Sequence, residues 1–254
     1  MRPTRGRLGL IVAGIAVVCA AAAWALTGGA RDKPSLGLFT TLPIYWAETA
    51  ALSDMLDRET RTGWARGALE ERYELVPLDT LARPDGSARG LARVDALLLA
   101  QPRALSPQEN VALDDWVRAG GRVLVFADPL LTAESRFPIG DRRRPQDVAL
   151  LSPILRRWGL EMRFDPDQPG GERIVETDLA PLPVNLAGTL HLVEGAATGC
   201  WIAYDRLFAQ CAVGNGVATV IADAALFEEP ADGGVQARAA ALDWLTGTAF
   251  ASDR

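Results

Sequence analysis

Residues 97–128 contain a strand, a helix and a second strand, and this order restricts the possible folds more than any other part of the chain. The helix begins with a capping box, in which Ser106 is the N-cap and Glu109 is the third helical residue. It ends at Gly120-Gly121, because glycine adopts the left-handed conformation of a helix C-terminus without steric cost. A strand–helix–strand unit of about thirty residues predicts two parallel strands joined by a crossover helix.

The rest of the chain alternates in the same way. Apolar runs predict further strands, and helical periodicity predicts further helices. The expected strands are residues 36–40, 73–78, 160–164, 208–213 and 217–222, and the expected helices are residues 47–58, 147–158 and 235–245. This alternation is typical of an α/β fold with a doubly wound, mostly parallel sheet. Short β segments within residues 165–205 predict a small β layer added to it.

An uncharged apolar segment begins at Leu8 and ends at Thr27. As a helix that rises about 1.5 Å per residue, its roughly twenty residues would cross about 30 Å of hydrocarbon. Arginines precede the segment, so the positive-inside rule places the rest of the chain outside the cytoplasm. A cleaved signal peptide is the alternative to a retained anchor. We therefore divide the chain into an N-terminal transmembrane anchor or signal peptide, residues 1–30, and an extracytoplasmic α/β domain, residues 31–254.

Charge and composition exclude several classes of function. The chain has 254 residues and a formal net charge of −6, so it lacks the basic footprint of a nucleic-acid-binding protein. One histidine and three cysteines are too few to suggest a His/Cys metal site. No glycine-rich phosphate loop follows the first predicted strand. We therefore expect no nucleic acid, no metal and no cofactor.

Ligands of open α/β sheets bind where the parallel strands end. Asp128 and Asp223 each end an apolar strand, while Thr41 and Gln101 follow two others, so these four residues are candidates for ligand binding. The two carboxylates could hold a cation or perform acid–base chemistry. Alternatively, each aspartate caps the turn that follows it, as aspartate commonly does, and we favour this interpretation.

The Arg142-Arg143-Arg144 triplet is the densest charge in the predicted domain. Arg142 and Arg143 are candidates for binding an anionic ligand or a lipid headgroup, because arginine makes bidentate contacts with phosphate and carboxylate. The alternative is a solvated loop whose arginines pair with Asp141 and Asp147.

Cys200 and Cys211 are candidates for a disulfide, which an oxidising compartment favours. If their strands pair directly through a turn at Asp205-Arg206, the two cysteines lie opposite each other. The alternative is a pair of buried free thiols, which behave as small apolar residues.

Residues 95–102, 105–109 and 120–129 resemble the auxiliary domain of ABC-type transport systems. This family includes the gliding-motility transporter auxiliary proteins and relatives in the eukaryotic intraflagellar-transport family. The block reads Leu-Ser-Pro-Gln-Glu and then Gly-Gly-Arg, and residues 217–223 and 242–247 extend it. The resemblance implies a fold like that of class I glutamine amidotransferases and flavodoxins, carried on a membrane anchor.

The same resemblance implies a non-catalytic accessory or binding subunit of an ABC-type transport or envelope system. Its partners would be the permease and ATPase components, and its domain would face the periplasm from the bacterial inner membrane. Amidotransferases of this fold use a cysteine activated by histidine and glutamate, and the loops beside the strand that ends at Asp128 carry no such set. Two alternatives stay open: a scaffold that joins envelope proteins, and a hydrolase or amidotransferase relative that uses Asp128 or Asp223.

Overall fold

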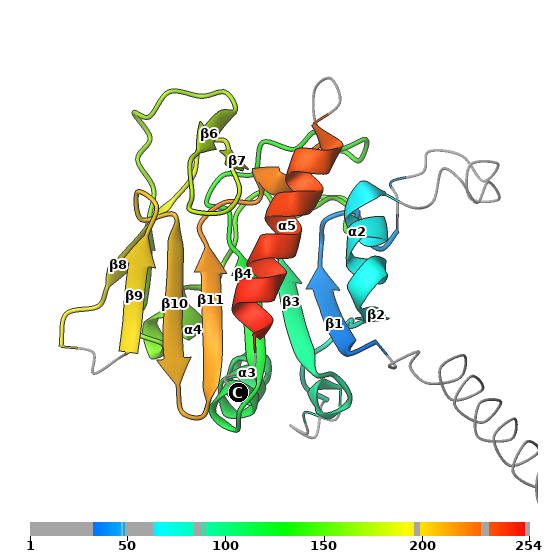
Figure 1. Ribbon diagram of the computed structural model, residues 1–254, viewed down its shortest axis with the longest axis vertical. Coiled ribbons are helices and arrows are strands. Elements are labelled where there is room, and N and C mark those ends of the chain that lie inside the picture. Colours follow the sequence, from blue (N-terminus) through cyan, green and yellow to red (C-terminus); the bar gives the residue numbers. More distant parts are fainter. Residues whose placement is uncertain are drawn as a thin grey trace, which may run out of the picture. The chain divides into compact units, whose positions relative to one another are not determined.

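The computed structural model describes residues 33–46, 48, 63–83, 88, 90–195, 199–229 and 234–251. All of the helices and strands described below belong to the unit that begins at Pro34. This unit is built around a seven-stranded sheet with the order β2-β1-β3-β4-β11-β10-β9 (Figure 1). The strands of this sheet are β1 (Ser35–Thr40), β2 (Glu74–Pro77), β3 (Ala96–Ala100), β4 (Arg122–Phe126), β9 (Gly199–Ala203), β10 (Phe208–Val213) and β11 (Gly216–Ile221).

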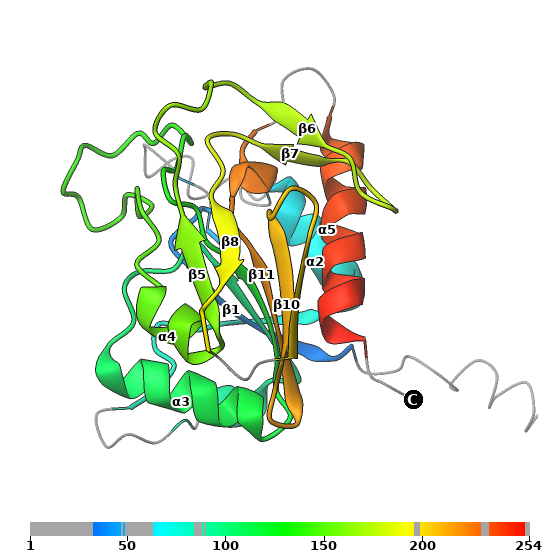
Figure 2. The same ribbon diagram turned by 90° about the vertical axis from the view of Figure 1, so that its left-hand side faces the viewer.

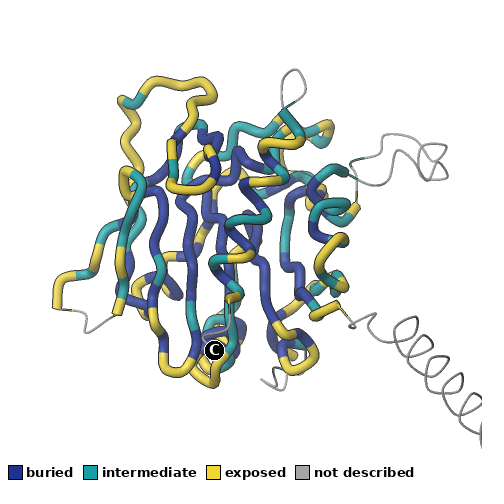
Figure 3. The backbone as a smooth tube through the Cα atoms, viewed as in Figure 1, coloured by how far each residue is buried: buried dark blue, intermediate teal, exposed yellow. Residues whose placement is uncertain are grey.

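The strands from β2 to β11 in this order are parallel to their neighbours, whereas β10 and β9 are added by antiparallel pairing. The parallel part has a strand order common among doubly wound sheets. Its central strands are buried along nearly their whole length, and Figure 3 shows them as the dark interior of the unit. Continuous apolar runs are expected for such strands, because helices cover both faces of a parallel sheet.

Helices cover both faces of the sheet. In the view of Figure 2, α2 (Trp64–Arg72) and α5 (Val235–Phe250) lie on one face, while α3 (Pro107–Arg118) and α4 (Ser152–Arg157) lie on the other. Two short 3₁₀ helices, η2 (Leu91–Arg93) and η3 (Ala225–Phe227), complete the helical elements of the described residues. The predicted α/β fold with a mostly parallel sheet is therefore confirmed.

The strand–helix–strand unit is confirmed in detail. The Ser106 hydroxyl accepts a hydrogen bond from the Glu109 N–H at 3.2 Å, and the Glu109 carboxylate accepts one from the Ser106 N–H at 2.9 Å. Gly120 follows the helix with φ 119°, a conformation that side chains rarely adopt. β3 and β4 pair in parallel on either side of α3 in the sequence.

The short β segments of residues 165–205 are distributed over several sheets. β6 (Arg173–Val175) pairs with β7 (Leu182–Val184), and β8 (Thr189–Leu192) pairs with β5 (Leu160–Arg163). β9 instead joins the main sheet as its edge strand.

The register of β9 and β10 places Cys200 directly opposite Cys211. A disulfide joins these two cysteines.

Two helix predictions differ from the structure. The helix predicted over residues 147–158 is wrong in its first half, since α4 begins only at Ser152. Proline is tolerated in the first turn of a helix, and Pro153 lies there in α4. Before the helix, the Ala149 N–H donates a hydrogen bond to the Asp128 carbonyl at 2.8 Å, which holds this segment in a non-helical conformation at the edge of the sheet. The α2 helix was not predicted. The helix predicted over residues 47–58 lies outside the described residues, apart from Glu48.

The predicted anchor, from Leu8 to Thr27, also lies outside the described residues. Within the described part of the chain, none of the helices combines the length and the apolar character needed to span a bilayer.

Candidate functional site

The loops that follow the parallel strands meet at one edge of the sheet, and four of the predicted binding residues lie there. Thr41 follows β1, Gln101 follows β3, Asp128 follows β4 and Asp223 follows β11. Gln101, Asp128 and Asp223 are buried, and Thr41 is half-buried. The candidates chosen from the sequence are thus at the expected edge.

Gln101 is the centre of a set of hydrogen bonds that joins these loops. Its Oε1 accepts from the Asp128 N–H at 2.9 Å, and its Nε2 donates to the Asp128 carbonyl at 3.2 Å and to the Gln146 carbonyl at 2.8 Å. The Thr41 hydroxyl donates to the Gln101 carbonyl and accepts from the Gln146 N–H. Because these bonds satisfy buried backbone groups, Thr41 and Gln101 hold the edge of the sheet together.

The carboxylates of Asp128 and Asp223 are also engaged by backbone groups. Asp128 accepts from the N–H groups of Leu130 at 2.8 Å and Ala224 at 3.1 Å, and Asp223 accepts from those of Ala225 at 2.6 Å and Asn185 at 3.0 Å. In each case one oxygen bonds the N–H two residues on, which is the geometry of an Asx turn. The turn-capping interpretation therefore describes both residues.

Burial changes the ionisation of this pair. It raises the pKa of Asp128 to about 6; the N–H groups of Leu130 and Ala224 oppose the rise, and the charge of Glu228 adds to it. Burial and the neighbouring charge of Asp128 raise the pKa of Asp223 well above its ordinary value. Both carboxyls therefore ionise less readily than exposed aspartates do.

The raised pKa of Asp128, about 6, predicts that its contribution to folding grows as the pH falls from about 7 to about 5. The folded state favours the protonated form, so this contribution is complete below the unfolded pKa of about 3.9 and is lost as the pH rises through the folded pKa. Relative to Asp128→Asn, the wild-type free energy of unfolding should increase by ~1 kcal/mol over this interval. Urea titrations at the two pH values measure the difference, and a pH-independent difference would contradict the prediction.

The two predicted arginines lie apart from this set of hydrogen bonds. Arg142 and Arg143 are exposed. The Arg143 guanidinium pairs with Asp141 at 2.7 Å and lies 4.2 Å from the centre of the Phe137 ring, so it is engaged within its own loop. Arg144 pairs with Asp147 at 3.1 Å, as the solvated-loop alternative expects.

A cavity of about 440 Å³ lies at the same edge of the sheet, and we call it the edge cavity. It is formed by the loops after β1, β4 and β11 together with the first turn of α2. The residues that give it chemical character are Ile44, Trp64, Thr132, Glu134, Phe227, Glu228 and Glu229. Its position is the one where open α/β sheets bind ligands.

Sequence reasoning did not identify the residues of this cavity. Neither Trp64 nor the glutamates after β4 and β11 are among the binding residues predicted from the sequence. The available indication was their position, because Glu134 and Glu228 lie only a few residues beyond Asp128 and Asp223. The predicted residues thus form the frame of the edge, and their neighbours line its cavity.

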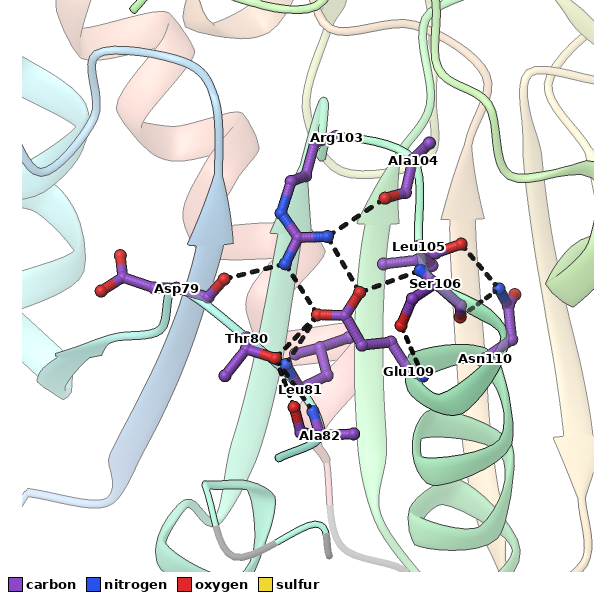
Figure 4. A network of polar contacts seen from close by, with 10 residues as sticks. All are labelled: Asp79, Thr80, Leu81, Ala82, Arg103, Ala104, Leu105, Ser106, Glu109 and Asn110. Carbon is purple, nitrogen blue, oxygen red and sulfur yellow. Dashed lines mark hydrogen bonds and ion pairs between the residues drawn. The ribbon is translucent and has the colours of Figure 1, made fainter. Parts of the chain in front are cut away.

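A second polar cluster supports the loops after β2 and β3 (Figure 4). The buried Glu109 carboxylate accepts hydrogen bonds from the Arg103 guanidinium at 2.7 and 2.9 Å, from the Thr80 hydroxyl at 2.9 Å and from the Leu81 N–H at 3.2 Å. Burial raises the pKa of Glu109, but Arg103 and these hydrogen bonds outweigh it and lower the pKa to about 2. The capping glutamate of α3 is therefore an ionised link between two loops.

Among the described residues, no group of three or more His, Cys, Asp or Glu side chains is arranged to hold a metal ion.

Three comparisons relate this chain to known proteins. A family model described as "ABC-type uncharacterized transport system" matches residues 33–167. A comparison with curated protein sequences finds no match. Among solved structures, the mmIFT52 N-terminal domain is similar with a TM-score of 0.52 at 13% identity, over 87% of this chain and 99% of that domain. At this identity the likeness concerns the fold alone.

Two glycosidases also match at lower TM-scores. The exo-β-1,4-mannosidase Op5Man5 from Opitutaceae bacterium strain TAV5 has a TM-score of 0.44 at 15% identity, over 85% of this chain and 34% of the enzyme. The β-galactosidase from Rahnella sp. R3 has a TM-score of 0.48 at 14% identity, over 95% of this chain and 34% of the enzyme. This chain therefore spans about a third of the length of each glycosidase.

Proposed function

Because the chain belongs to the ABC-type transport auxiliary family, we propose that it is a non-catalytic accessory subunit that binds a ligand or partner for an ABC-type transport system. The family match is the observation that carries this proposal, and it supports an accessory role in transport. The permease and ATPase components of such a system are the partners we propose.

The chemistry of the sheet edge supports binding rather than catalysis. Asp128 and Asp223 are buried, and backbone N–H groups bond to them, so neither is presented to a substrate. The described residues that line the edge cavity include no cysteine, serine or histidine that could serve as a nucleophile or its base. The one histidine, His191, lies on β8, which is in a separate two-stranded sheet.

A periplasmic domain tethered to the bacterial inner membrane is part of the same proposal. The uncharged segment from Leu8 to Thr27, preceded by arginines, supports the tether. The Cys200–Cys211 disulfide supports an extracytoplasmic location, since cytosolic proteins rarely keep such bonds. The amidotransferase-like character of the fold is likewise proposed from the family and the strand order.

Reduction of this disulfide should destabilise the domain. The bond closes a loop with a sequence separation of 11 residues, and loss of such a link costs ~2–3 kcal/mol in the chain-entropy account. Urea unfolding with and without a phosphine reductant measures this cost. The Cys200→Ala, Cys211→Ala double variant is the control, because its unfolding should not respond to reductant. Coincident wild-type transitions under both conditions would contradict the prediction.

Copurification from membranes tests the accessory role. The full chain would carry a C-terminal tag in its native host, be crosslinked in intact cells and be purified in mild detergent. Mass spectrometry should then show enrichment of an ABC permease and its ATPase. The matched control carries a cleavable secretion signal in place of residues 1–30, which keeps the compartment and removes the tether.

Each outcome of this experiment has a meaning. Enrichment with the full chain and with the untethered control supports recognition by the domain itself. Enrichment with the full chain alone supports association that requires residues 1–30. No enrichment of ABC components with either protein would overturn the proposal, and so would turnover of a substrate by the purified chain that depends on Asp128 or Asp223.

A further inference from the structure

We infer that the edge cavity binds a small organic ligand that carries an ammonium group. The volume of about 440 Å³ is in the range of small-molecule sites. The described lining residues combine two aromatic side chains with three carboxylates and include no lysine, arginine or histidine. Aromatic faces attract organic cations, and carboxylates provide the opposite charge.

The aromatic wall of the cavity is anchored in the core. The rings of Trp64 and Phe227 stack at 20° with centroids 6.5 Å apart, and both side chains are half-buried. Phe227 also packs edge-on against Phe126, with centroids 4.7 Å apart, and Phe126 is the last residue of the central strand β4. A wall held in this way loses little conformational freedom when a ligand binds.

The negative charge of the cavity comes from different loops. Glu134 lies in the loop after β4, and Glu228 and Glu229 lie after η3. The Thr132 hydroxyl donates to Glu228 Oε1 at 2.6 Å, so this carboxylate is oriented by a neighbouring residue of the lining. Fixed charges favour a ligand more than mobile ones do, because less ordering accompanies binding.

Two positive groups that the described residues place beside the cavity do not cancel this charge. The first turn of α2 contributes the positive end of a helix dipole, equivalent to only about half a charge, against three carboxylates. Arg66, in the same turn of the helix, is directed elsewhere: it bonds to Glu70 at 2.7 Å and to the Tyr45 carbonyl at 2.9 Å. The described lining of the cavity therefore favours a cation over an anion.

The inference rests on the proposed binding role, which it deepens by naming the ligand class. Its test uses the purified full chain in detergent without any partner. A negative result would therefore leave copurification with a transporter unaffected, and a failed copurification would leave the ligand measurement unaffected.

The experiment compares cations with neutral molecules of the same shape. Choline is paired with 3,3-dimethyl-1-butanol, and phenethylammonium is paired with 2-phenylethanol. Isothermal titration at constant ionic strength should show at least one cation binding about tenfold more tightly than its neutral counterpart, which corresponds to about 1.4 kcal/mol. Equal affinities within both pairs, or no binding of either cation, would overturn the inference.

Variants of the lining identify the cavity as the binding site. Trp64→Leu and Glu228→Gln should each weaken binding of the preferred cation by about fivefold or more. Glu134→Gln changes an exposed residue, so it tests the charge without a risk to the fold. Glu71→Gln, on the exposed surface of α2 and outside the lining, is the matched control. Cation binding that is unchanged in all three lining variants would place the site elsewhere and overturn the inference.

Discussion

Replacement of Gly216 by alanine should destabilise the domain by about 4 kcal/mol or more, enough to lower the melting temperature by roughly 10 °C. A Cβ atom at this position would lie 2.0 Å from the Val117 carbonyl oxygen and 2.3 Å from the Gly121 carbonyl oxygen. Both neighbours are backbone atoms, so the clash cannot be relieved by a side-chain rotation. The β10–β11 hairpin would have to move away from the end of α3.

Urea and thermal unfolding of Gly216→Ala measure this effect. Gly247→Ala is the matched control, because the Cβ of that residue would meet nothing within 4 Å and the residue lies inside α5. Alanine is a better helix former than glycine, so the control should gain up to about 1 kcal/mol. If the two variants unfolded at similar urea concentrations, the close contact between the hairpin and α3 would be refuted.

Glu109→Gln should cost about 3 kcal/mol near neutral pH. In the folded protein the pKa of Glu109 is lowered from its ordinary value of 4.5 to about 2, so ionised Glu109 favours the folded state. That contribution is complete above the unfolded pKa and is lost as the pH falls through the folded one. The amide of glutamine cannot reproduce the charge that faces Arg103, and it weakens the capping box with Ser106.

The pH dependence separates this effect from a simple loss of packing. The difference between wild type and Glu109→Gln should be constant from about pH 7 to about pH 5 and should shrink below the ordinary pKa of 4.5 that the unfolded chain retains. Asp115→Asn, on the exposed side of α3, is the control and should change stability by less than about 0.5 kcal/mol. A Glu109→Gln penalty that persists undiminished near pH 2.5 would show that charge does not cause it.

The central part of the fold could be predicted because local sequence preferences and tertiary packing favour the same helices and strands there. The capping box at Ser106, the glycines that end α3 and the apolar runs of β3 and β4 are each sufficient to define an element boundary. The β10–β11 hairpin was predictable for the same reason, since Gly214 and Gly216 supply the turn.

Predictions failed where a distant contact outweighed the local pattern. Residues 147–151 have helical periodicity, but the Ala149 N–H bonds to the Asp128 carbonyl and the helix starts only at Ser152. The α2 helix has no side-chain cap and a weak apolar face, so the sequence offered little indication of it. In the structure α2 packs against α5, which lies far along the chain.

The amino-acid sequence alone determined the α/β class, the family and the positions of the strand ends, because capping, glycine conformation and apolar periodicity act over a few neighbouring residues. It also led to the residues that frame the sheet edge, Thr41, Gln101, Asp128 and Asp223. Only the tertiary structure decided that the side chains of these residues form hydrogen bonds with backbone groups. It also decided that the cavity is lined by Trp64 and by glutamates of separate loops. Burial and proximity between residues far apart in the sequence depend on how the strands are ordered in the sheet, and no local pattern encodes that order.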